Sequence, residues 1–137
     1  MTGHIPRRAA PAASSRPVPA VLIAAVGTAA QADRAIAAGA DMIDAAGLSD
    51  QAVAAIRARH PGVRLWAGSP AVGADGATAA DGPAMPIAAV VARAAVLTWL
   101  GTPAIRTGHV LPVRRAIDMT SSIAGTRLPS LTTRGLG

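Results

Sequence analysis

The segment from Arg106 to His109 brings together side chains that are suited to binding an anion. Arg106 supplies a guanidinium that can donate a bidentate pair of hydrogen bonds to a phosphate, and Thr107 supplies a hydroxyl. Pro112 suits the first turn of a helix, where its missing N–H removes no hydrogen bond. The amides before it would lie at a helix N-terminus, which favours negative charge, and Gly108 has no Cβ to keep a ligand from the backbone. The sequence therefore predicts a weak anion site on this segment, with the imidazole of His109 beside it.

Asp44 is the second polar residue whose position indicates chemistry, because it lies at the carboxyl end of an expected strand. It is the one candidate acid or base that the sequence offers. A structural interpretation is the alternative: Arg106 forms an ion pair with Asp44 or with Asp118, or is simply solvated, instead of binding an anion. In the same way, His109 serves the fold instead of a ligand. Because no serine has a recognisable base partner, no catalytic residue is assigned.

Four strands and four helices are expected to position these residues. Continuous apolar runs predict strands, and apolar residues at helical spacing after Thr, Ser or Pro predict helices. The expected strands cover 19–27, 41–47, 63–67 and 104–105, and the expected helices cover 29–38, 50–60, 86–100 and a last stretch that begins near 112. The stretch 68–84 is rich in Gly, Ala, Asp and Pro, and we expect it to be a mobile loop.

Strand and helix alternate along the chain, which indicates an α/β fold with a parallel sheet and covering helices. A complete (β/α)8 barrel, or TIM barrel, needs about 250 residues. This chain has 137 residues. We therefore expect an incomplete barrel of about four strands, roughly half of a TIM barrel, in one domain over residues 19–123. A disordered leader over 1–18 precedes it, and a tail over 124–137 follows it.

The formal net charge is +6, and arginine supplies all 13 of the Lys and Arg side chains. No basic run with interleaved aromatic residues occurs, so nucleic acid is not an expected partner. No apolar stretch is long enough for a transmembrane span, so no membrane partner is expected either. Without Cys, and with His4 and His60 far apart, no metal or other cofactor is expected. We expect a cytoplasmic protein; the alternative is export, with Arg7-Arg8 as a twin-arginine signal.

Residues 101–119 resemble the last strand–helix unit of the dihydropteroate synthases, the pterin-binding barrels of folate synthesis. That family carries a G-A-x-x-x-R-x-H-D-V pattern, in which the Arg and His hold the pyrophosphate of the pterin substrate. In GTPAIRTGHV the register is kept, and Arg106 falls on the family's Arg. Gly108 stands at the family's His, however, and His109 stands at its Asp. The resemblance continues through RRAIDM and into the tail GTRLPSLTTRGLG, which is similar to actinobacterial members.

Residues 39–47 (GADMIDAAG) resemble a second motif of the family, G-A-D-I-I-D-x-G-G, with Asp41 and Asp44 in place. The family continues Glu-Ser-Thr-Arg-Pro, where this chain has LSDQ. The family holds the pterin ring through Asn, Asp and Lys, whereas this chain contains no Asn and no Lys. Each unpaired donor or acceptor of the ring would cost about 1–3 kcal/mol. We therefore do not expect the chain alone to synthesise dihydropteroate.

The resemblance and the departures from it together imply a truncated, degenerate dihydropteroate-synthase-like protein. We expect it to be non-catalytic and to act by binding, either through a weak site for phosphate or pterin phosphate or by association with itself or a full-length homologue. The alternative is a residual folate-pathway transferase whose site a second chain completes. Association is favoured because half a barrel leaves two open edge strands and one uncovered apolar face.

Overall fold

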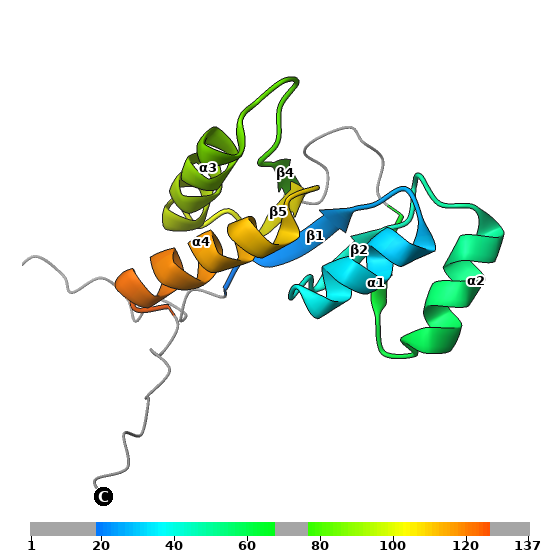
Figure 1. Ribbon diagram of the computed structural model, residues 1–137. Coiled ribbons are helices and arrows are strands. Elements are labelled where there is room, and N and C mark those ends of the chain that lie inside the picture. Colours follow the sequence, from blue (N-terminus) through cyan, green and yellow to red (C-terminus); the bar gives the residue numbers. More distant parts are fainter. Residues whose placement is uncertain (1–18, 68–76, 127–137) are drawn as a thin grey trace, which may run out of the picture.

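The computed structural model describes residues 19–67 and 77–126. Within these ranges strands and helices alternate along most of the chain (Figure 1). In chain order the elements are β1 (Val21–Ala25), α1 (Ala29–Ala37), β2 (Met42–Asp44), α2 (Asp50–Arg59), β3 (Arg64–Trp66), β4 (Ala77–Ala79), α3 (Ile87–Trp99), β5 (Ala104–Thr107) and α4 (Val110–Ile123).

The strands form one parallel sheet in the order β3-β2-β1-β5-β4. β1 is its centre, because Ile23 lies opposite Met42 of β2 on one side and opposite Arg106 of β5 on the other. β3 extends the sheet beyond β2, and β4 extends it beyond β5. The predicted α/β fold of parallel strand–helix units is therefore confirmed.

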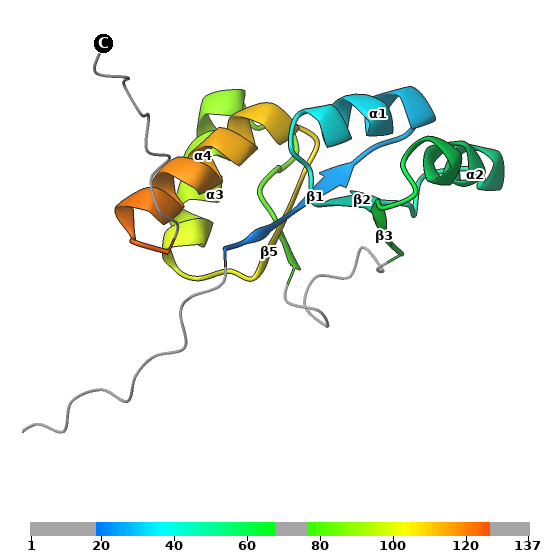
Figure 2. The same ribbon diagram turned by 90° about the horizontal axis from the view of Figure 1, so that it is seen from below.

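The four described helices lie on one face of the sheet, as Figure 2 shows. Neighbouring side chains of a strand point to opposite faces, so Leu22 and Ala24 of β1 face these helices together with Ile43 and Ile105. The helices add buried apolar residues to the same cluster: Ala32, Ala35, Ile56, Val90, Ala94, Val113, Ala116 and Ile117. Removal of this apolar surface from water is the main term that holds helices and sheet together.

Capping residues begin the first two helices, as the sequence predicts. Thr28 Oγ1 accepts a hydrogen bond from the amide of Gln31 at 3.1 Å, and Ser49 Oγ accepts one from Ala52 at 3.2 Å. Each bond satisfies an amide that the first turn of a helix leaves without a partner. Pro112 lies in the first turn of α4, as predicted.

The region 68–84 differs from the prediction of a loop. Residues 68–76 lie outside the described part of the chain, but Ala77–Ala79 form β4, which pairs with Ala104–Arg106 of β5. Three small residues carry almost no apolar pattern of their own, so this strand is defined by its partner and not by its sequence. The sheet consequently has five described strands, one more than expected.

Two further predictions concern the ends of the chain. The leader over 1–18 lies outside the described residues, as does most of the tail over 124–137. Ala124–Thr126 terminate α4: Gly125 has φ +72°, and the amide of Thr126 donates to Ser121 O at 2.9 Å. No helix among the described residues is both long enough and apolar enough to cross a membrane.

Candidate functional site

Polar side chains gather where the parallel strands end. Asp44 is the last residue of β2, Arg106 and Thr107 end β5, and Asp81 follows β4 by two residues. Ligand sites of open parallel sheets lie at this carboxyl edge. The structure thus brings the predicted residues to one edge, together with Asp81, which the sequence analysis did not select.

Asp44 and Arg106 form an ion pair across the central strand. Arg106 Nε donates to Asp44 Oδ2 at 2.7 Å, and Asp44 Oδ1 accepts a second hydrogen bond from the amide of Ala46 at 3.0 Å. β2 and β5 flank β1, so this pair spans β1 on the face opposite the helices. The Asp44 side chain is only 6% exposed and that of Arg106 is 39% exposed. The ion pair that was the alternative to anion binding by Arg106 is therefore formed. Asp44 has little surface with which to contact a substrate.

Asp118, the other partner considered for Arg106, pairs with a different arginine. Arg114 Nη2 lies 3.0 Å from Asp118 Oδ1, one turn along α4. Arg114 Nη1 also donates to Asp41 Oδ2 at 3.1 Å. These three residues join α4 to the start of β2, away from the carboxyl edge.

At the turn predicted to bind an anion, the hydroxyl of Thr107 and the amide of Gly108 form a cradle of donors. This cradle already holds a carboxylate of the chain itself. Thr107 Oγ1 donates to Asp81 Oδ1 at 2.6 Å, and the Gly108 amide donates to Asp81 Oδ2 at 2.6 Å. The amide of His109 donates to Thr107 Oγ1 at 2.9 Å, so the Thr107 hydroxyl both donates and accepts. Thr107 is fully buried. An external anion at this turn would have to displace Asp81 first.

His109 occupies the N-cap position of α4, but its side chain makes no capping hydrogen bond. His109 is half-buried and directly follows the Thr107–Gly108 turn. The two interpretations of His109, contact with a ligand and a purely structural role, both stay predictions, because the absence of a capping bond favours neither of them. Among the described residues, no three His, Cys, Asp or Glu side chains are grouped so that they could hold a metal ion.

Asp81 is the polar residue that reasoning from the sequence missed. One sequence signal points to it, because Asp81 followed by Gly82-Pro83 marks a chain reversal. Ala77–Ala79 carry almost no pattern that predicts the strand they form, so the sequence does not place Asp81 at a strand end.

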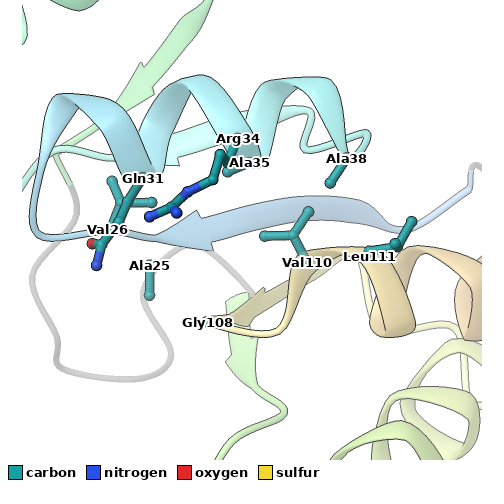
Figure 3. Close-up of a pocket in the computed structure, with 9 residues that line it drawn as sticks. All are labelled: Ala25, Val26, Gln31, Arg34, Ala35, Ala38, Gly108, Val110 and Leu111. Atoms are coloured by element: carbon teal, nitrogen blue, oxygen red, sulfur yellow. The ribbon is translucent and has the colours of Figure 1, made fainter.

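A hollow of about 480 Å3 lies over β1 on the helix side of the sheet (Figure 3). α1 packs against α2 and α3 packs against α4, so that two helix pairs flank β1. The hollow lies between α1 and the beginning of α4, where Val110 and Leu111 border it. Gln31 and Arg34 of α1 give it a polar side.

Comparison of the chain with models of known protein families, with curated proteins and with solved structures finds no match. The residues of the chain and their geometry are therefore the basis for its function.

Proposed function

We propose that this chain is a dihydropteroate-synthase-like binding protein, without synthase activity of its own, that acts in the cytoplasm by associating with a second copy or a full-length homologue. The order of the strands carries the proposal. β5, the last strand, lies beside β1, the first, and β2 and β3 follow on the other side. A closed barrel also joins its last strand to its first, so this strand order is compatible with an arc of a barrel that is interrupted between β3 and β4.

Both ends of this arc are open. β3 pairs only with β2, and β4 only with β5, among the described strands. An edge strand presents unpaired N–H and C=O groups, which favour pairing with another chain. The face opposite the helices adds half-buried side chains, such as Trp66 on β3 and Ala79 on β4. A partner that supplied strands at these edges would satisfy the backbone groups and cover that face.

The state of the polar edge supports a binding role over a catalytic one. The Asp44 carboxylate is held by Arg106, and the donors of the Thr107–Gly108 turn are held by Asp81. The chain also lacks the Asn and Lys through which dihydropteroate synthases hold the pterin ring. A site for phosphate or pterin phosphate is consequently weak at most, and it opens only when Asp81 moves.

Sedimentation velocity over the micromolar range tests association. We expect the wild-type chain to sediment as an oligomer, and Ala77→Lys to shift it toward monomer because a lysine opposes pairing at the β4 edge. Ala88→Lys, on the exposed side of α3, is the matched control and should sediment like the wild type. A compact wild-type monomer at all concentrations would overturn the proposal.

The alternative, a residual folate-pathway transferase, predicts a different result. A second chain that completed the site would give measurable product from pterin pyrophosphate and p-aminobenzoate, and Arg106→Ala would abolish it. We expect no product from the purified chain, because the ring-binding groups are missing. Product above background with Arg106 intact would favour the alternative.

A further inference from the structure

The hollow over β1 exists because the side chains that face it are small. Ala35 of α1 and Ala38 at its C-cap line it, and Ala25 borders it at the end of β1. Leucine at position 35 or 38 would fill the space between α1 and α4. Val26 and Val110 complete an aliphatic lining. Its volume of about 480 Å3 is within the range of pockets that bind small molecules.

One side of the hollow carries a cation without a counter-charge. The Arg34 side chain extends along the hollow toward Gln31 (Figure 3). Within residues 19–67 and 77–126 it has no hydrogen bond or ion pair, whereas Arg59, Arg106 and Arg114 each pair with a carboxylate. No acidic side chain is among the described residues that line the hollow.

Gln31 adds a donor next to this cation. Its Oε1 accepts a hydrogen bond from the Gly27 amide at 2.7 Å, which fixes the orientation of the side-chain amide. The Nε2 group of Gln31 is therefore the end left to donate. Arg34 and Gln31 lie one turn apart on α1, so their donors border the same side of the hollow.

We propose that this hollow binds an aliphatic monocarboxylate, with its alkyl body against the alanine and valine lining and its carboxylate on Arg34 and Gln31. One guanidinium matches the single charge of a carboxylate and can donate to both of its oxygens. A phosphate dianion would meet only that one cation. The proposal does not depend on association of the chain, because the hollow lies on the helix side of the sheet.

Titration of the full chain with octanoate, followed by the shifts of backbone amides in NMR spectra, tests the proposal. We expect saturable shifts at Val26, Ala35 and Val110, with a Kd in the millimolar range typical of so small a ligand. Acetate has the head without the body, and octylammonium has the body with the opposite charge. Both should bind at least about tenfold more weakly.

Two variants separate the contribution of the carboxylate to binding from that of the alkyl chain. Arg34→Gln should weaken octanoate binding about tenfold, while Arg57→Gln, an exposed arginine of α2 outside the hollow, should leave it unchanged. Ala38→Leu should abolish binding by filling the hollow. If that variant does not fold, Arg34→Gln decides alone, because its side chain is exposed. An unchanged Kd in Arg34→Gln, equal binding of octylammonium, or no shifts in the wild type would each overturn the proposal.

Discussion

Polar clusters lie at both ends of the parallel strands: at the amino edge, where the strands begin, and at the carboxyl edge, where they end. The two clusters differ in burial. At the amino edge, Asp41 Oδ2 accepts from the Leu22 amide at 2.8 Å and from Arg114 at 3.1 Å. At the carboxyl edge, Asp44 binds Arg106 and Asp81 binds Thr107. The Asp41 side chain is 45% exposed, whereas the Asp44 side chain is 6% exposed.

This difference shows that polar residues at a carboxyl edge can be engaged with one another. In barrel enzymes the carboxyl edge carries the chemistry and the amino edge carries stability. Here the carboxyl edge satisfies its own donors with its own carboxylates, and the Asp44 carboxylate has less water around it than that of Asp41. The pair of Asp44 with Arg106 should therefore contribute more to stability than the contacts of Asp41.

The largest effect is expected from Arg106→Met, which keeps the length of the side chain and removes its charge. Asp44 would remain buried without its cation, and the free energy of unfolding should fall by about 2 kcal/mol. That value is below the range for fully buried pairs because Arg106 is 39% exposed. Urea unfolding measures it.

A double-mutant cycle separates the charge from the packing in this comparison. Asp44→Asn combined with Arg106→Met should regain much of the lost stability, because no buried charge is left unpaired. If the double variant is less stable than the single Arg106→Met variant, the ion pair is not what stabilises this edge.

A smaller loss is expected at the amino edge from Asp41→Ala. This change removes the acceptor of the Leu22 amide and the partner of Arg114, and the free energy of unfolding should fall by about 1–1.5 kcal/mol. Arg59→Ala, which breaks the exposed pair of Arg59 with Asp33, is the control and should cost at most about 0.5 kcal/mol. A loss of stability in Asp41→Ala as large as that in Arg106→Met would show that the two edges do not differ in their contribution to stability.

A loss somewhat smaller than that of Asp41→Ala is expected from Asp81→Ala, about 1 kcal/mol, because water can replace the carboxylate at the exposed Gly108 amide. The variant should instead gain an anion response. Inorganic phosphate should shift the Gly108 amide resonance in Asp81→Ala and raise its stability, with little effect on the wild type. Sodium chloride at equal ionic strength is the control for screening. Equal phosphate shifts in both proteins would show that Asp81 does not close the cradle.

Much of the fold could be predicted because the sequence signals are local. The apolar run before Gly27 predicts the central strand, and Thr28 and Ser49 predict where two helices begin. β4 could not be predicted, because Ala77–Ala79 become a strand only by pairing with β5. The order of the strands is likewise a property of pairings between distant segments, which local patterns do not contain.

The sequence predicted which residues meet at the candidate site, but it did not predict which of them bind one another. Asp44, Arg106 and Thr107 do meet at one edge, because parallel strands end on the same side of a sheet. The sequence left open whether Arg106 pairs with Asp44, with Asp118 or with an anion, since that choice depends on distances across β1. Asp81 lay outside the prediction, so the occupation of the cradle could not be foreseen, and anion binding there stays a prediction.

The central place of β1 also determines the order in which the chain can fold. β1 pairs with β2, which follows it closely, and with β5, which comes near the end of the described chain. Closing a longer loop costs more entropy, so β1, β2 and β3 with their helices can form before β5 arrives. During synthesis one side of β1 stays unpaired until Thr107 has left the ribosome. The bond between Asp44 and Arg106 can form only once β5 has joined the sheet, and it then links this late strand to an early one.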